Sequence, residues 1–87
     1  MWYFYFARCS DGSLYSGITN NIKRRERLHN DGKASQYTKY RRPVKIIYSE
    51  VYQNKSEARV REIQIKKWSR IKKENLLKIN NYAADRN

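Results

Sequence analysis

Five consecutive aromatic residues, Trp2 to Phe6, constrain the fold of this chain more than any other feature. Aromatic side chains favour β-strands, where they pack on the pleated surface. Asp11-Gly12 then indicates a turn, and residues 14–18 (Leu-Tyr-Ser-Gly-Ile) have the pattern of a returning strand. The sequence therefore predicts an amino-terminal β-hairpin.

The length of the hairpin loop decides whether Tyr5 and Tyr15 share a face of the sheet. A three-residue loop, Ser10-Asp11-Gly12, points both tyrosines the same way, because side chains alternate along a strand. A two-residue loop, Asp11-Gly12, puts them on opposite faces. Glycine suits the left-handed third position of the longer loop, so we favour the register in which both tyrosines point the same way. Plain core packing is the alternative role for each ring.

The pattern after the hairpin predicts a helix, a loop and a third strand. Thr19 or Asn20 can cap a helix that runs to about Asn30. A basic polar loop follows over residues 33–42. Residues 44–51 are mostly apolar and rich in β-branched side chains, which is typical of a strand.

Two further helices complete the pattern. Asn54 and Glu57 form a capping pair for a helix that runs to about Lys67, and Ser69 can cap the next helix. The order ββαβαα predicts an α+β domain in which helices flank a small three-stranded antiparallel sheet.

The chain of 87 residues has room for one small domain. We assign this domain to residues 1–80 and expect residues 81–87, which show no periodicity, to be a disordered tail. Cys9 is the single cysteine, so no internal disulfide can form. No apolar run approaches the roughly 18 residues of a membrane span, and no signal-peptide pattern is present. We therefore expect a cytoplasmic protein and, for so small a domain, a monomer.

The net charge of +12 arises from 20 Lys and Arg residues against 8 Asp and Glu residues. Such an excess opposes compaction unless a polyanion neutralises it, and nucleic acid is the commonest such partner. Tyr37, Tyr40 and Trp68 interleave the cations, which suits stacking on unpaired bases. The alternatives are a membrane surface, ribosome assembly through bulk charge, and a solvated charged face. The expected nucleic-acid contacts are Lys33, Lys39, Arg41, Arg42, Lys66, Lys67, Arg70, Lys72 and Lys73.

The first predicted helix carries two basic residues on an apolar stripe. Ile22, Arg25 and His29 share one side of this helix. The apolar residue at position 22 implies that the stripe faces the sheet, so Arg25 and His29 point inward or line a rim. A half-buried arginine needs an anionic partner. A structural ion pair and an external phosphate both meet that need.

The next helix carries an acid on its apolar stripe, which is formed by Ala58, Glu62 and Ile65. A carboxylate on such a face is paired, protonated or bound to metal, and the residues alone leave a salt bridge and a metal site equally open. Glu57, near the start of the helix, is explained by capping. Glu74 lies among lysines, and we expect it to be solvated.

The joint spacing of five residues resembles the pattern of the GIY-YIG nucleases. Tyr3-Phe4-Tyr5 stands at the first motif triplet and Tyr15-Ser16-Gly17 at the second, where Gly17 keeps the motif glycine. The segments 8–15, 41–44 and 62–69 are similar to the short stand-alone bacterial members of that family, and the likeness covers roughly residues 1–79. The five positions are Tyr5, Tyr15, Arg25, His29 and Glu62.

The resemblance implies a divalent-metal-dependent endonuclease that hydrolyses nucleic acid, with DNA the expected substrate. Glu62 is then the ligand of Mg²⁺ or Mn²⁺, because Mg²⁺ needs few protein oxygens besides water and phosphate. Arg25 is the group that holds the developing phosphate charge. Tyr5, supported by Tyr15, is the group that orients or deprotonates the attacking water if a metal or Arg25 lowers its pKa. His29 is the other candidate base, because its ordinary pKa lies near neutrality.

Two departures from the family pattern keep other functions open. Some members have a lysine where this chain has Ile18, and many have a site asparagine that none of Asn75, Asn80 and Asn81 matches in spacing. A non-catalytic nucleic-acid-binding module of the same fold is the first alternative. A subunit whose substrate choice comes from a protein partner is the second.

Overall fold

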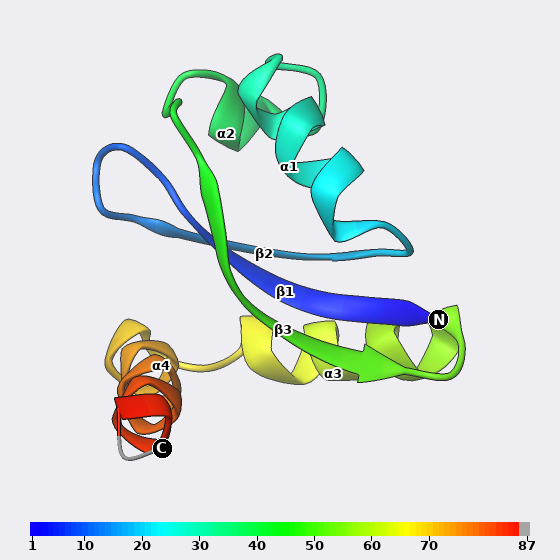
Figure 1. The fold of residues 1–87 in the computed structure, drawn as a ribbon, viewed down its shortest axis with the longest axis vertical. Helices are drawn as coiled ribbons and strands as arrows, with labels where there is room; N and C mark the ends of the chain where they lie inside the picture. Colours follow the sequence, from blue (N-terminus) through cyan, green and yellow to red (C-terminus); the bar gives the residue numbers. More distant parts are fainter. Residues whose placement is uncertain (86–87) are drawn as a thin grey trace.

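The computed structural model describes residues 1–85, with side chains described up to residue 79, and it confirms the predicted α+β fold (Figure 1). The elements are β1 (Trp2–Arg8), β2 (Leu14–Thr19), α1 (Ile22–Asn30), α2 (Gln36–Lys39), β3 (Lys45–Tyr52), α3 (Lys55–Lys66) and α4 (Arg70–Asp85). The predicted order ββαβαα is present, and the short helix α2 is an addition within the segment that was expected to be a basic loop.

The sheet is antiparallel, with strand order β2-β1-β3 and β1 in the centre. Tyr5 lies opposite Gly17, and Ala7 lies opposite Tyr15. At the loop the Cys9 amide donates to the carbonyl of Ser13 at 3.0 Å. Gly12 has a φ of 85°, the left-handed conformation expected at this position. The register of a three-residue loop is therefore confirmed, and Tyr5 and Tyr15 share one face.

The two faces of the sheet are covered by different helices. On one face Phe4 and Phe6 pack with Ile65 of α3 and Leu77 of α4, and all four are buried. On the other face Tyr5, Ala7, Cys9 and Val44 form a second buried cluster, against which Ile22 of α1 packs. In Figure 1 the sheet runs between α1 and α2 above and α3 and α4 below. The aromatic strand β1 thus supplies both cores of a thin domain.

Helix capping agrees with the sequence analysis at two of three starts. Asn54 accepts the amide of Glu57 at 2.9 Å, and Ser69 Oγ accepts the amide of Lys72 at 3.2 Å. At α1 the cap is Asn21, neither Thr19 nor Asn20. The reason is that Thr19 Oγ1 accepts the Asn21 amide at 3.1 Å, a turn that delays the helix and frees the Asn21 side chain to cap it.

The C-terminal helix α4 continues to Asp85, so residues 81–85 of the expected tail are helical. Residues 86–87 lie outside the described residues, and a single domain over residues 1–80 stays a prediction.

The expected solvation of Glu74 was wrong. Its carboxylate pairs with the guanidinium of Arg8 through two bonds, of 2.7 and 2.9 Å. Bidentate pairs of this kind have favourable geometry and tie distant elements together. This pair links the end of β1 to α4 across 66 positions of the chain, a contact that local sequence patterns do not reveal.

Helix α3 offers a matched pair of isoleucines for testing the core. Ile65 is 0% exposed between the helices and β1, whereas Ile63 is 49% exposed on the same helix. We predict that Ile65→Ala lowers the free energy of unfolding by about 2–5 kcal/mol, because it leaves a cavity. Ile63→Ala should lower it by less than about 1 kcal/mol. Urea unfolding measures both, and equal losses would contradict this packing.

Candidate active site

The site begins with the close approach of Tyr5 to Gly17 across the hairpin. A Cβ atom at Gly17 would lie 2.8 Å from the Tyr5 hydroxyl oxygen and 3.0 Å from Cζ. Real Cβ atoms do not approach so closely, so only glycine leaves room for this ring. The glycine of the second motif triplet therefore has a steric reason: it lets the Tyr5 ring lie across β2 and reach α1.

The Tyr5 hydroxyl meets His29, and His29 meets Thr38. Tyr5 Oη lies 2.8 Å from His29 Nε2, and His29 Nδ1 lies 2.8 Å from Thr38 Oγ1. All three residues are 0% exposed. A strand of the hairpin, helix α1 and helix α2 are thus joined by one buried chain of hydrogen bonds.

The direction of this chain follows from its ends. Thr38 Oγ1 donates to the carbonyl of Ser35 at 3.4 Å, so the same oxygen accepts from His29 Nδ1–H. That leaves Nε2 as an acceptor, and Tyr5 donates its hydroxyl proton to it. The charged neighbour Arg25 agrees with this assignment, because a guanidinium has donors and no acceptor. The imidazole is therefore the Nδ1–H tautomer.

Burial sets the protonation of both groups. Burial raises the pKa of Tyr5 well above its ordinary value, with a further increase from Tyr15, and these outweigh the lowering by Arg25. Burial and then the charge of Arg25 lower the pKa of His29 to about 4. Without a bound metal, Arg25 alone therefore does not lower the pKa of Tyr5 below its ordinary value, and the pKa of His29 lies below its ordinary value near neutrality. Both groups are neutral at pH 7.

Arg25 is half-buried on α1, on the side expected from the stripe with Ile22 and His29. Its charge acts on both Tyr5 and His29, which places the guanidinium beside that pair. It also lines a small pocket of about 100 Å³ with Thr19, Asn21 and neighbouring residues. A guanidinium held between a buried neutral pair and an opening to solvent is positioned to bind an anion.

Tyr15 belongs to a stack at the edge of the sheet. Its ring lies 5.3 Å from that of His29 and 6.1 Å from that of Tyr37, with which it is nearly parallel. The Arg41 guanidinium covers the ring of Tyr37 at 3.9 Å, and Asp11 holds Arg41 at 3.1 Å. Tyr37 is therefore clamped between a tyrosine and a cation.

This stack borders a cleft of about 270 Å³ that crosses the outer edge of β2. Leu14, Tyr15 and Ser16 of β2 line it, together with Tyr37 from one side of the sheet and Lys66 and Lys73 from the other. The two basic segments of the sequence therefore meet at one opening, with Tyr15 in its wall.

Glu62 lies beside this cleft. It is 6% exposed, and its carboxylate pairs with Lys66 at 3.3 Å and with Arg59 at 3.6 Å. Lys66 is also a wall of the cleft, and the charge of Glu62 contributes to the raised pKa of Tyr5. The carboxylate is thus within electrostatic reach of the tyrosines. A salt bridge and a metal site are both compatible with this geometry, since the carboxylate is ion-paired and the side chains of its two partners are exposed.

Two other carboxylates, those of Glu50 and Glu26, have structural partners. Glu50 binds the guanidinium of Arg61 through two bonds and accepts from the hydroxyls of Tyr48 and Tyr52. Glu26 accepts the Ile46 amide at 2.7 Å. Among the described residues, no three His, Cys, Asp or Glu side chains form a group that could hold a metal ion. A metal here would take Glu62 as its protein ligand and draw its other ligands from water and phosphate, which Mg²⁺ accepts.

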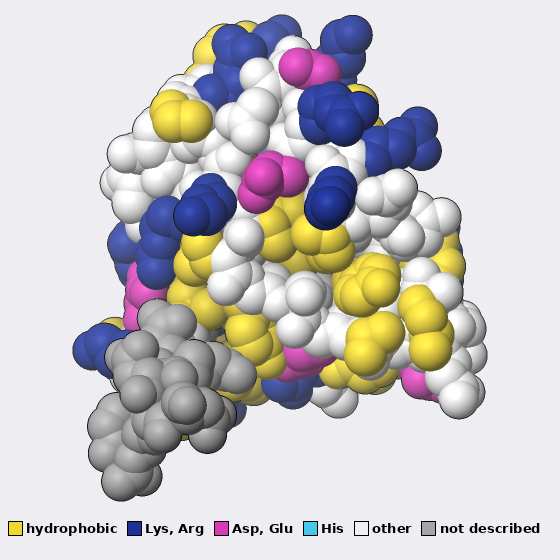
Figure 2. All heavy atoms as spheres, viewed as in Figure 1, with side chains coloured by type: hydrophobic (Ala, Val, Ile, Leu, Met, Phe, Trp, Pro, Cys, Tyr) yellow, Lys and Arg dark blue, Asp and Glu magenta, His cyan; other side chains and the backbone are white. Residues whose placement is uncertain are grey.

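The expected nucleic-acid contacts lie on the surface, except that Arg41 and Lys73 are half-buried. Several already have protein partners: Arg42 donates to the carbonyls of Asn30 and Lys39, and Arg70 donates to that of Gly12. On the face drawn in Figure 2, Lys and Arg side chains gather over the end that holds α1 and α2. Within residues 1–85 no helix is long and apolar enough to cross a membrane.

Comparison with known proteins decides the family. Residues 1–75 match the model of the GIY-YIG catalytic domain. The chain belongs to the GIY-YIG family. This is a family of nucleases, and its domain implies a nucleic-acid substrate, so the resemblance seen in the sequence is confirmed.

Similar members of the GIY-YIG family are small bacterial proteins. A UPF0213 protein of Staphylococcus aureus is 49% identical over 74 residues, which are 85% of this chain and 90% of that protein. A UPF0213 protein of Bacillus pumilus is 47% identical over 72 residues, which are 83% of this chain and 74% of that protein. The expectation of a short stand-alone member is therefore confirmed.

Two solution NMR structures share the fold. The UPF0213 protein of Bacillus halodurans has a TM-score of 0.59 and 38% identity, covering 91% of this chain and 85% of that one. A protein of E. faecalis has a TM-score of 0.60 and 39% identity, covering 92% of this chain and 85% of that one.

The sequence analysis missed Thr38, and it named Tyr37 only as a ring for stacking on unpaired bases. Thr38 fixes the tautomer of His29, and Tyr37 stacks on Tyr15. Both lie in α2, which Ser35 caps by accepting the Tyr37 amide at 3.1 Å. A serine followed by polar residues is a usable signal for a short helix. The contact of Thr38 with His29 joins two different helices, so it leaves no periodic pattern in the sequence.

The hydrogen-bond chain makes a prediction for His29, the single histidine of the protein. Its ring should be the Nδ1–H tautomer at pH 7 and should protonate only near pH 4. Because the lowered pKa disfavours the charged form, the stability that His29 contributes is full above about pH 6.5 and is lost as the pH falls toward 4. Long-range proton–nitrogen NMR spectra of the ring measure both properties.

Thr38→Val should free Nδ1–H of its acceptor and lower the free energy of unfolding by about 1–3 kcal/mol. It should also shift part of the ring to the Nε2–H tautomer. Thr38→Ser, which keeps the hydroxyl, is the matched control. A wild-type ring in the Nε2–H form would contradict the direction assigned to the chain.

Proposed function

We propose that this GIY-YIG domain is a divalent-metal-dependent endonuclease that cuts DNA. The observation that carries the proposal is that the buried Tyr5 contacts His29 and Tyr15 and interacts electrostatically with both Arg25 and Glu62, while Tyr15 lines a cleft with Lys66 and Lys73. These groups come from five separate elements, β1, β2, α1, α3 and α4. Cations such as Arg25, Lys66 and Lys73 suit the charge of a phosphodiester, and the carboxylate of Glu62 suits a metal ion.

Arg25 is the residue that holds the scissile phosphate. Its planar guanidinium can bind two phosphate oxygens at once and oppose the charge that develops on them. The neutral Tyr5–His29 pair beside it keeps its position without neutralising its charge. A carboxylate in that place would compete with the substrate for the same cation.

Glu62 is the residue that holds the metal ion, which would polarise the phosphate and lower the pKa of a bound water. Its present partners do not prevent this role. The side chains of Arg59 and Lys66 are 63% and 54% exposed, whereas that of Glu62 is 8% exposed. Both cations can turn to the phosphates of the substrate when a metal ion replaces their charge beside the buried carboxylate.

Tyr15 is the residue that contacts the attacking water. It is half-buried and lines the cleft, whereas Tyr5 is 0% exposed and its hydroxyl proton is donated to His29. Burial raises the pKa of Tyr5, so its phenolate form is disfavoured. We therefore assign Tyr5 a positioning role, in which it fixes Arg25 and His29, and this reverses the order of the two tyrosines that the resemblance implies.

A non-catalytic nucleic-acid-binding module is the second candidate. The specific observation in its favour is that Glu62 is already neutralised by Arg59 and Lys66. Such a module would bind DNA with a strong dependence on salt and would not cut it in the presence of a metal.

Metal-dependent cleavage of plasmid and branched DNA separates these functions. With Mg²⁺ or Mn²⁺ the wild type should nick DNA, and EDTA should stop it. Glu62→Gln and Arg25→Lys should each lower the rate by about 10²–10³-fold, because each removes a contact to the transition state. Glu57→Gln, on the exposed start of the same helix, is the matched control and should stay within about twofold. DNA binding without metal-dependent cutting would select the second candidate, and equal cleavage by all variants would point to a contaminant.

The two tyrosines are distinguished by whether their substitution lowers the cleavage rate at saturating DNA or the apparent affinity for DNA. Tyr15→Phe should abolish the metal-dependent rate at every pH, because it removes the hydroxyl at the cleft. Tyr5→Phe should lower the rate mainly through a weaker apparent affinity for DNA, since it releases Arg25. The reverse pattern would assign the water to Tyr5.

A further inference from the structure

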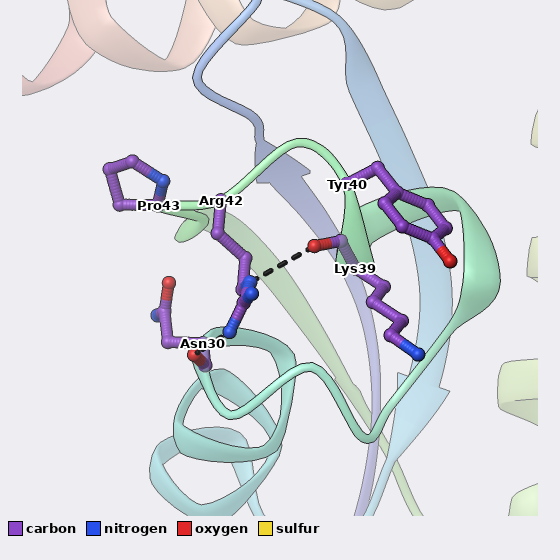
Figure 3. Close-up of a pocket in the computed structure, with 5 residues that line it drawn as sticks. All are labelled: Asn30, Lys39, Tyr40, Arg42 and Pro43. Carbon is purple, nitrogen blue, oxygen red and sulfur yellow. Dashed lines mark hydrogen bonds between the residues drawn. The ribbon is translucent and has the colours of Figure 1, made fainter.

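A second pocket, of about 460 Å³, opens at the C-terminal end of α2. Its walls are Asn30, Lys39, Tyr40, Arg42 and Pro43 (Figure 3). None of the residues that line it is acidic, and two of the five are cations. The pocket is therefore suited to an anionic ligand with a flat apolar part.

The base of this pocket is held by hydrogen bonds. Asn30 donates to the Val44 carbonyl at 2.8 Å and accepts the Val44 amide at 2.7 Å. Arg42 donates through Nε to the Lys39 carbonyl at 2.9 Å and through Nη1 to the Asn30 carbonyl at 3.2 Å. These bonds join the ends of α1 and α2 to the start of β3, so the pocket keeps its shape without a ligand.

Tyr40 presents its ring to solvent at the edge of this pocket. The residue is 76% exposed, and Lys39 Nζ lies 5.6 Å from the centre of its ring. Figure 3 shows Tyr40 and Pro43 on opposite sides of the pocket, with Arg42 between them. An exposed aromatic ring beside cations is the arrangement that stacks a base while the cations bind the neighbouring phosphates.

The position of α2 links this pocket to the candidate active site. Tyr37 lines the cleft at β2, and Tyr40 lines the second pocket. Residues three apart on a helix have Cβ atoms about 5–6 Å from each other. Lys39 also lines a neighbouring pocket of about 260 Å³ together with Lys33. A strand in the cleft can therefore continue over α2 with cations along its path.

We propose that the Tyr40 pocket holds an unpaired nucleobase, so that the preferred substrate carries a single-stranded segment next to the phosphate that is cut. This inference rests on the proposed function and narrows its substrate. Duplex DNA does not meet the requirement, because its bases are stacked on each other and cannot offer a face to Tyr40. An unpaired base offers both faces, and every base type can stack in this way.

Binding in EDTA tests the inference without cleavage. Fluorescence anisotropy measures the affinity of the full chain for a labelled twelve-nucleotide single strand and for a blunt duplex of twelve base pairs without a loop, at one fixed salt concentration. Tyr40→Ala should weaken binding of the single strand by about 5- to 100-fold. Binding of the duplex should change by less than about twofold. Tyr40→Phe, which keeps the ring, should bind the single strand as the wild type does.

A second readout reports base stacking directly, so that a loss of stacking is distinguished from a variant that fails to fold. The fluorescence of 2-aminopurine within the single strand should be quenched by the wild type and by Tyr40→Phe, and the quenching should be lost in Tyr40→Ala. Unchanged affinity of Tyr40→Ala for the single strand would overturn the inference, and so would an equal loss for single strand and duplex. If the wild type binds in this pattern but does not cut DNA with Mg²⁺, the proposed nuclease fails and the base pocket stands. If the wild type cuts DNA and Tyr40→Ala binds the single strand normally, the base pocket fails and the proposed nuclease stands.

Discussion

The contact of the Tyr5 ring with Gly17 is the constraint on which the rest of the site depends. The three-residue hairpin loop puts these residues opposite each other, and the missing Cβ lets the ring lie across β2. From there the hydroxyl reaches His29 at 2.8 Å. Any other side chain at position 17 would displace the ring and break the chain of hydrogen bonds that joins the hairpin to α1 and α2.

The buried chain gives Arg25 a neutral surrounding in a protein of +12 net charge. A charged imidazole beside this arginine would repel it, and a carboxylate would neutralise it. Burial keeps the imidazole of His29 uncharged at neutral pH, because it lowers the pKa of His29 to about 4. Among the described residues, the carboxylates Glu50 and Glu74 are held by other arginines. Arg25 is thereby left to act on an external anion, and Glu62 is the nearby acid whose cationic partners are weakly held.

Much of this arrangement could be predicted from local patterns. The glycine of the hairpin loop indicated the register, and the helical stripes indicated that Arg25, His29 and Glu62 face the interior. The family pattern then joined these residues into one site. The cap at Asn21, the pair of Glu74 with Arg8 and the acceptor role of Thr38 could not be predicted. These three features depend on a backbone turn or on contacts between distant segments. Turns and distant contacts leave no periodic pattern in the sequence. The shifts in the pKa of Tyr5 and of His29 were not predicted, because they depend on burial, which the sequence shows only in outline.

The central claim is that one ion and one phosphate meet between Glu62, Arg25 and Tyr15. Paramagnetic broadening by Mn²⁺, added in small amounts to the nitrogen-15-labelled protein bound to a short DNA duplex with a single-stranded overhang, tests this meeting directly. The account predicts that broadening is centred on residues 62, 25 and 15 and disappears in Glu62→Gln. Broadening centred on Glu50 or Glu74, or a pattern that Glu62→Gln leaves unchanged, would contradict it.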